Sequence, residues 1–158
     1  MQVLILYYSK GGNTKKLAQE IAKGVVSTGA IAVLKSTVQV TKNDFLESSA
    51  IIAGSPVYFG SMAADLKRVF DEYVGLRMKM ENKIGAAFTS GGHHTGGKET
   101  TILSILQAML IYGMIIVGDP IKASGHYGVG CTGSPDKKAL GDAFKLGVRV
   151  AELCKKFI

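Results

Sequence analysis

The sequence has no tryptophan, only two cysteines and only three prolines among its 158 residues. Cys131 and Cys154 cannot form a disulfide framework or an iron–sulfur ligand set within one chain, so we expect two reduced thiols. No stretch approaches the roughly 20 apolar residues that a membrane span requires. The chain opens on the apolar run Val3–Leu6 without a basic leader. These absences predict a soluble, cytoplasmic protein that makes no membrane contact.

Long runs of one charge are also missing. Lysine and arginine never occur more than two in a row, although the net charge is +7. This pattern argues against a nucleic-acid-binding arm and suits a surface that attracts anions, such as a phosphorylated cofactor or an acidic redox partner. With 47% hydrophobic and 20% charged residues, the chain has a globular composition, and its length suits one domain over residues 1–158.

Short apolar runs alternate with stretches of helical period, which is typical of an α/β protein with a parallel sheet. The five expected strands are Val3–Tyr8, Ile31–Lys35, Ala50–Gly54, Ile84–Thr89 and Met114–Val117. Apolar stripes predict a first helix along Leu17, Ile21 and Val25 and a last helix along 140–151. Only a turn or two of helix fits after the second strand, with Asn43 or Asp44 as its cap. A doubly wound, three-layer sheet of order 2-1-3-4-5 would bind ligands at its carboxyl edge.

Polar loops follow the first, third and fourth expected strands, so this topology would bring them to one crevice. The first loop joins a strand to a helix that begins near Asn13 or Thr14. Its hydroxyls, its glycines and the free amides of the helix suit a terminal phosphate, although a plain turn capped by Thr14 would also explain the glycines. The phosphate-binding candidates are Ser9, Lys10, Gly11, Gly12, Asn13 and Thr14.

The second loop places two aromatic residues beside a turn-forming proline and a glycine, and their rings could pack on a flat heterocycle or lie in the core. Its candidate residues are Pro56, Val57, Tyr58, Phe59 and Gly60. The third loop is too polar for the core, and its amides could bond the polar edge of a flavin. Its candidates are Ser90, Gly91, Gly92, His93, His94 and Thr95.

Several alternatives fit less well. The run Gly92–Lys98 resembles a nucleoside-triphosphate loop, but Glu99 stands where a hydroxyl should bind magnesium. Gly11-Gly12 lacks the third spaced glycine of a dinucleotide fingerprint. Strands one and three do not end in the aspartates of a phosphorylated receiver domain. Adjacent histidines lack a suitably spaced third ligand, so no metal is expected.

Four segments together resemble a known family: Tyr7–Ser9, Gly54–Met62, Gly96–Ile102 and Tyr112–Met114. They are similar to the flavodoxin-like NAD(P)H:quinone oxidoreductases of the tryptophan-repressor-binding-protein type and to related NADPH-dependent FMN reductases. The resemblance covers nearly the whole chain. It implies a flavodoxin-like fold, bound FMN, NADH or NADPH as hydride donor and a quinone-like acceptor. In this reading the first loop holds the phosphate, the second flanks the ring and the third bonds its polar edge.

The chain departs from that family at several positions. Gly11 replaces an aromatic residue in the first loop, Tyr112 replaces a histidine, no tryptophan lies near Leu76–Met78, and the linker after the second strand is short. Tyr112, His93 and Tyr127 are candidates for tuning the flavin, and no catalytic residue is assigned. An enzyme reducing a small acceptor is favoured over the alternative, a flavodoxin that carries electrons between redox proteins, because such carriers are usually acidic. The sequence leaves open whether the protein forms a homo-oligomer.

Overall fold

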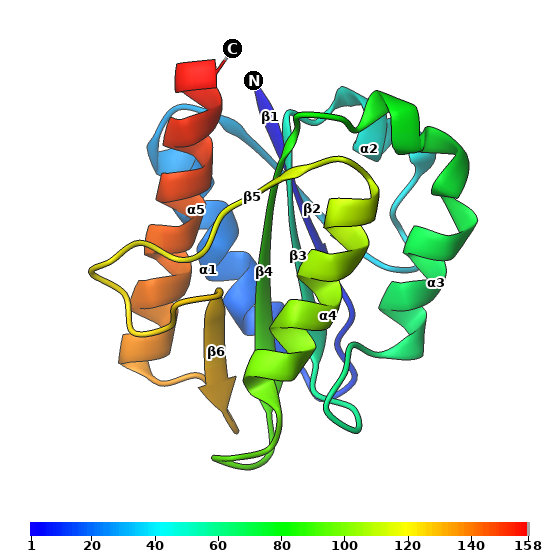
Figure 1. The fold of residues 1–158 in the computed structure, drawn as a ribbon. Coiled ribbons are helices and arrows are strands. Elements are labelled where there is room, and N and C mark those ends of the chain that lie inside the picture. Colours follow the sequence, from blue (N-terminus) through cyan, green and yellow to red (C-terminus); the bar gives the residue numbers. More distant parts are fainter. Residues whose placement is uncertain (158) are drawn as a thin grey trace.

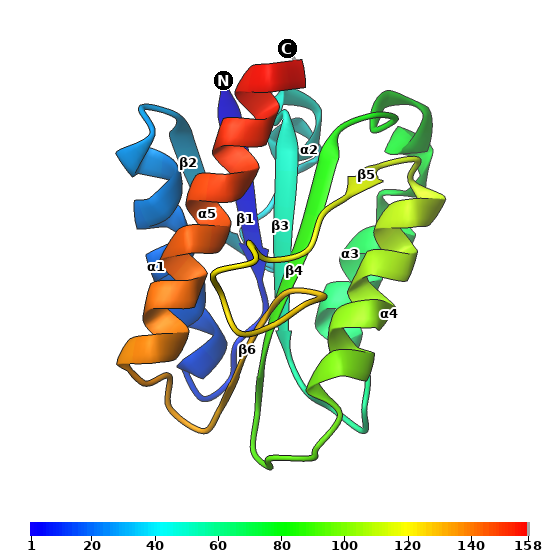
Figure 2. The ribbon, with the colours of Figure 1, turned by 60° about the vertical axis from the view of Figure 1, so that its left-hand side comes forward.

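The structure, a computed structural model, describes residues 1–157 and has a central sheet between two layers of helices (Figures 1 and 2). The elements are β1 (Gln2–Tyr7), α1 (Asn13–Ser27), β2 (Ile31–Ser36), α2 (Lys42–Glu47), β3 (Ala50–Pro56), α3 (Ala64–Glu72), the 3-10 helix η1 (Val74–Lys79), β4 (Ile84–Gly91), α4 (Lys98–Ile111), β5 (Ile115–Ile116), β6 (Val129–Thr132) and α5 (Lys137–Phe157). None of the described helices has the length and apolar character needed to cross a membrane.

The strands are parallel and lie in the order β2-β1-β3-β4-β5, with β6 beside β4. The expected flavodoxin-like order is therefore confirmed. Strands β1, β3 and β4 are buried on both faces over most of their length, because α1 and α5 cover one face of the sheet and α2, α3 and α4 cover the other (Figure 2). Every strand runs toward the same edge, so the loops that follow β1, β3 and β4 meet there.

The outer edge of the sheet differs from the expectation. A single fifth strand over Met114–Val117 was predicted, but β5 pairs only with Ile84 and Gly85 at the start of β4. The edge of β4 near its end is paired instead by β6, which the sequence analysis missed. The chain between them, 117–128, leaves the sheet and returns. Strand β6 has the sequence Val-Gly-Cys-Thr and alternates buried and exposed residues, so it offers no continuous apolar run to recognise.

The short helix after β2 was expected, but its cap was assigned wrongly. Thr41 is the N-cap: its hydroxyl accepts a hydrogen bond from the Asp44 amide at 3.3 Å, and the Asp44 carboxylate accepts one from the Thr41 amide at 2.7 Å. Asp44 is thus the third residue of a capping box rather than the cap itself.

Candidate functional site

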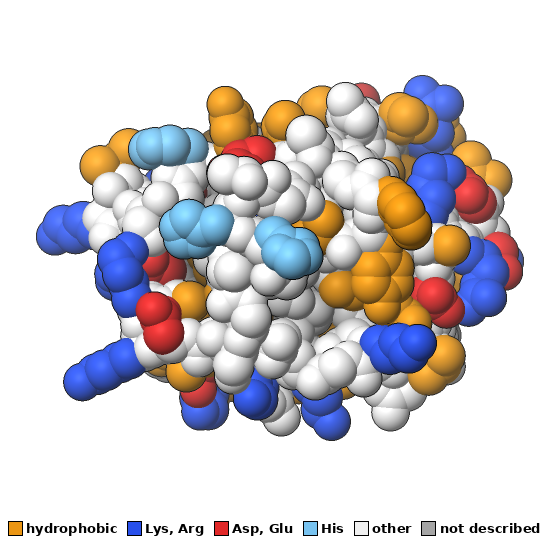
Figure 3. All heavy atoms as spheres, turned by 90° about the horizontal axis from the view of Figure 1, so that it is seen from below, with side chains coloured by type: hydrophobic (Ala, Val, Ile, Leu, Met, Phe, Trp, Pro, Cys, Tyr) orange, Lys and Arg blue, Asp and Glu red, His pale blue; other side chains and the backbone are white. Residues whose placement is uncertain are grey.

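A cleft of about 330 Å³ lies at the carboxyl edge of the sheet, where the three loops meet. Figure 3 faces this edge and shows uncharged polar groups, backbone and histidine side chains in its middle, with lysine and arginine toward the rim. The cleft is within the usual size range of a small-ligand site. Its lining residues are Ser9, Lys10, Gly11, Asn13, Thr14, Pro56, Val57, Tyr58, Ser90, Gly91, Gly92 and Gly133. All but Gly133 belong to the three predicted loops.

The first loop presents free amides to the cleft. Gly12 precedes α1 with φ of +92°, a left-handed conformation that glycine adopts readily. Its amide donates to the Ser9 hydroxyl at 3.1 Å, and the first helical hydrogen bond runs from the Lys16 amide to the Gly12 carbonyl. No side chain caps α1, and its first turn has no acidic residue. The amides of the first turn therefore lack helical partners, an arrangement that suits an anion.

The first and third loops are joined through two buried hydroxyls. Thr14 Oγ1 and Ser90 Oγ lie 2.8 Å apart, and either can be the donor. Thr14 is one of the predicted phosphate-binding residues; it is only 1% exposed, and its hydroxyl is paired with Ser90. One hydrogen bond uses one of the two protons, so the accepting hydroxyl keeps its own proton for a ligand.

The second loop is a tight, anchored turn. Tyr58 and Ser61 exchange both backbone hydrogen bonds at 3.0 Å, and the residues between them, Phe59 and Gly60, have φ of +51° and +75°. Positive φ at both central positions is typical of a type I′ turn, which rarely has phenylalanine at its first central position. The Tyr58 ring meets Tyr8 edge to face at 6.3 Å and lines the cleft. Phe59 does not line the cleft, because its side chain is fully exposed.

Loops two and three contact each other. A Cβ on Gly97 would lie 2.9 Å from the Gly60 Cα atom, so only glycine permits this approach. Beyond the cleft wall, the third loop turns outward, and His93, His94 and Thr95 are exposed and do not line the cleft. His94 borders a separate polar hollow with Lys98 and Cys131. Gly12 and Gly60 also lie outside the lining, where they shape the two turns instead.

Comparison with known proteins agrees with this arrangement. Residues 28–128 match the NADPH-dependent FMN reductase family. An NAD(P)H dehydrogenase (quinone) from Archaeoglobus fulgidus is 35% identical over 98% of this chain and 98% of its own length. The chain belongs to the NADPH-dependent FMN reductase family. A protein named flavodoxin from Aquifex aeolicus is also 35% identical, over 99% of this chain and 89% of its own. The solved structure of a flavodoxin from the domain Archaea superposes with a TM-score of 0.84 at 29% identity, covering 98% of this chain and 99% of that one.

The donor set of the cleft fits the cofactor of the NADPH-dependent FMN reductase family. Uncapped helix amides suit the phosphate of FMN, the aromatic wall suits its ring, and the backbone that follows β4 at Gly92 suits its polar edge. Partial burial, with Asp65 and Tyr58 nearby, raises the pKa of Tyr8, so its phenol is neutral at physiological pH. No cluster of three metal-ligating side chains occurs among residues 1–157.

The structure contradicts the expected tuning role of Tyr112. Helix α4 begins at the carboxyl edge and runs back along the sheet (Figure 1), so Tyr112 at its end lies at the opposite edge. Its hydroxyl donates to the Phe70 carbonyl at 2.6 Å, and burial, with a contribution from Asp71, raises its pKa to about 12. Tyr127 is half-exposed, precedes β6 and does not line the cleft. Tyr112 therefore lies away from the cleft, whereas the tuning roles of Tyr127 and His93 stay predictions.

One lining residue escaped the sequence analysis. Gly133, with φ of +67°, follows β6, and its amide donates to the Gly91 carbonyl at 2.8 Å. The turn sequence Gly133-Ser134-Pro135 was the available signal, but it marks a site only once β6 is recognised.

Cys131, in β6, is buried, and this burial raises the pKa of its thiol to about 11 despite the nearby Lys98. It therefore stays a thiol at neutral pH and is a poor nucleophile.

Proposed function

We propose that the protein oxidises NADPH or NADH and passes the electrons through FMN to a small quinone-like acceptor. The observation that carries the proposal is the cleft, in which uncapped helix amides, an aromatic wall and a third loop of backbone amides meet. When bound, FMN supplies the redox chemistry, and the protein supplies binding, orientation and shielding.

Each part of the cleft has a separate task in this proposal. The first turn of α1 binds the phosphate, and the Thr14–Ser90 hydroxyl pair holds the first and third loops together around it. Tyr58 bounds one side of the ring and is itself braced by Tyr8. The backbone of the third loop, from Gly92 onward, donates to the polar edge of the ring. The exposed side of the cleft is left for the nicotinamide and the acceptor in turn, a ping-pong sequence that needs no nucleophile or metal.

A second candidate is an electron carrier that serves partner proteins. It is supported by the Aquifex aeolicus relative named flavodoxin, which matches 99% of this chain. The Archaeoglobus fulgidus dehydrogenase, in contrast, contains residues that this chain lacks. Its alignment spans 187 positions, whereas this chain has 158 residues. The net charge of +7 favours the enzyme, because carriers that dock on basic partners are expected to be acidic.

Anaerobic stopped-flow mixing tests the proposal. FMN-loaded protein is mixed with NADPH, and in parallel with NADH, while the visible flavin absorbance is followed. The enzyme should bleach rapidly with at least one nucleotide and recover its absorbance when 1,4-benzoquinone is added. A flavin that binds tightly but is reduced by dithionite and by neither nucleotide would support the carrier instead.

A further inference from the structure

A second hollow, which we call the α5 groove, lies between the 117–128 segment and helix α5. Its volume is about 750 Å³, and it shares no lining residue with the cleft. The apolar part of its lining consists mainly of Ile121, Phe144, Val148 and Leu153. Ile121 is 96% exposed, and Phe144 is also exposed. Neighbouring apolar side chains that are rimmed by polar residues are typical of an interaction surface.

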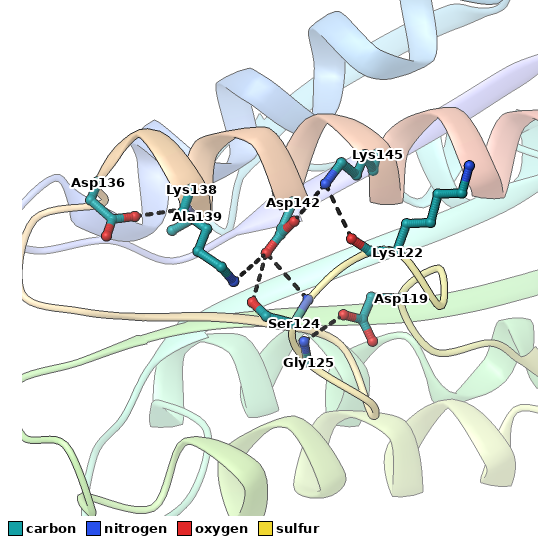
Figure 4. A network of polar contacts seen from close by, with 9 residues as sticks. All are labelled: Asp119, Lys122, Ser124, Gly125, Asp136, Lys138, Ala139, Asp142 and Lys145. Carbon is teal, nitrogen blue, oxygen red and sulfur yellow. Dashed lines mark hydrogen bonds and ion pairs between the residues drawn. The ribbon is translucent and has the colours of Figure 1, made fainter.

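The groove is held in shape by a polar network (Figure 4). Ser124 donates to Asp142 Oδ2 from its hydroxyl at 2.7 Å and from its amide at 3.3 Å. Lys145 Nζ donates to Asp142 Oδ1 at 3.0 Å and to the Lys122 carbonyl at 3.3 Å. The Gly125 amide donates to Asp119 at 2.8 Å. The bonds of Asp142 and Lys145 tie the segment to α5, and the Gly125–Asp119 bond braces the segment itself, so a partner would meet a preformed surface and would not have to order it.

The groove has more basic than acidic residues in its lining. Lys122, Lys145, Arg149 and Lys156 border it, and Glu152 is its one acidic lining residue. Lys145 is paired with the buried Asp142. Within residues 1–157, the other three cations have no salt bridge. The groove therefore presents uncompensated positive charge beside an apolar floor, which complements a ligand that is both acidic and apolar.

Arg149 narrows the choice of ligand. Its Nε atom is buried and has no hydrogen-bond partner among the described residues, and a buried, unsatisfied donor is costly. This Nε atom is not accessible from the groove, but Arg149 lines the groove, and a guanidinium fork matches a carboxylate with two parallel hydrogen bonds. A side chain on a peptide can enter such a hollow, whereas the flat surface of a bilayer cannot. The geometry thus favours an acidic polypeptide over an anionic membrane.

We propose that the α5 groove docks an acidic amphipathic segment of a partner protein. One apolar side chain of the segment packs on Ile121 and Phe144, and an aspartate or glutamate binds Arg149, with Lys122 and Lys156 adding attraction at the rim. Because the groove and the cleft have no lining residue in common, docking leaves the cleft open. The interaction recruits a partner and does not require it to cover the flavin site.

The probe for the test is a short synthetic helical peptide with leucine and glutamate on one face. It is titrated into ¹⁵N-labelled, FMN-loaded protein, and amide shifts are mapped. Shifts should cluster on 119–124 and 144–156. Arg149→Gln and Ile121→Ser should each weaken binding by about tenfold. The matched controls Lys79→Gln and Val38→Ser alter an exposed charge and an exposed apolar residue outside the groove, and they should bind like the unaltered protein.

A peptide with glutamine in place of every glutamate should bind at least about tenfold more weakly. Equal binding of the two peptides, shifts outside the groove, or no shifts at all would overturn the proposal. Two further measurements test whether a membrane or a second copy of the chain occupies the groove instead. Co-sedimentation with phosphatidylglycerol vesicles that is lost in Arg149→Gln would assign the groove to a membrane. A dimer in sedimentation velocity that the same substitution dissociates would assign it to a second copy of the chain.

Discussion

Thr14 shows how one buried hydroxyl can couple two loops of the cleft. Replacing it by valine keeps the shape but removes its hydrogen bond to Ser90. Ser90 is itself 6% exposed, so its hydroxyl would then lack this partner and the junction of the two loops would loosen. We expect Thr14→Val to weaken FMN binding by about 1.5 kcal/mol, roughly tenfold. Fluorescence titration with FMN measures this directly.

Thr14→Ser provides the matched control, because it keeps the hydroxyl and loses only a methyl group. Its affinity for FMN should stay within about threefold of the unaltered protein. If the valine variant binds FMN like the unaltered protein while the serine variant loses affinity, the cause is packing of the methyl group, and the hydroxyl pair has no part in binding.

Phe59 combines backbone strain with full exposure. Its φ of +51° places a bulky residue in the left-handed region, which costs about 1–2 kcal/mol. Its exposed ring gains no burial in return. Since asparagine is favoured at this position of a type I′ turn, Phe59→Asn should raise the free energy of unfolding by about 1 kcal/mol. Urea denaturation of the flavin-free protein is the measurement. Phe59→Ala, which keeps the strain, should change stability little, and a destabilised asparagine variant would contradict the turn assignment.

At the scale of elements, α1 and α5 pack closely against each other at two glycines. A Cβ on Gly147 would lie 2.1 Å from the Ile21 carbonyl oxygen, and one on Gly24 would lie 2.1 Å from that of Phe144. Gly147→Ala would force the helices apart and should cost about 2 kcal/mol of stability. At Gly141 of the same helix, a Cβ would meet nothing within 4 Å. Gly141→Ala should instead stabilise by about 0.5–1 kcal/mol, so thermal unfolding should move the two variants in opposite directions.

Tyr112 ties α4 to α3 by donating its hydroxyl proton to the Phe70 carbonyl. Burial raises its folded pKa to about 12, above the value of about 10 in an unfolded chain. The bond therefore stabilises fully below pH 10, and its contribution is lost as pH rises from about 10 to 12. Tyr112→Phe should cost about 1–2 kcal/mol at pH 7. Urea unfolding should show this difference shrinking above pH 10, and a difference that grew with pH would refute the assignment.

Sequence patterns predicted elements well where burial is continuous and poorly where it is not. Strands β1, β3 and β4 are long apolar runs and were found, whereas β6 has three glycines within or directly beside a four-residue strand. Its position depends on close approach, since a Cβ on Gly128 would lie 2.2 Å from the Ala87 carbonyl oxygen. Such a contact arises only after folding and leaves no periodic signal. The Thr41 cap was missed for a local reason, because Asp44 can serve as a cap or as the third residue of a capping box.

At the scale of the whole molecule, topology made the site predictable. Once the strand order was inferred, the three polar loops had to meet, and most of their residues line the cleft. The prediction that failed was the position of Tyr112 near the flavin. Helix α4 runs away from the carboxyl edge, so Tyr112 at its end lies far from the three loops. A helix of fourteen residues is about 21 Å long, so that error could have been avoided from the expected helix length alone.

The last prediction concerns FMN and the stability of the entire chain. A ligand that binds only the folded protein raises its stability by about 2.7 kcal/mol at a concentration one hundred times Kd. For a protein of this size, that corresponds to a rise in Tm of roughly 5–10 °C. Riboflavin lacks the phosphate that the first turn of α1 is placed to bind, so at the same concentration its shift should be much smaller. Differential scanning calorimetry with each flavin tests this, and equal shifts would show that the phosphate lies outside the first loop.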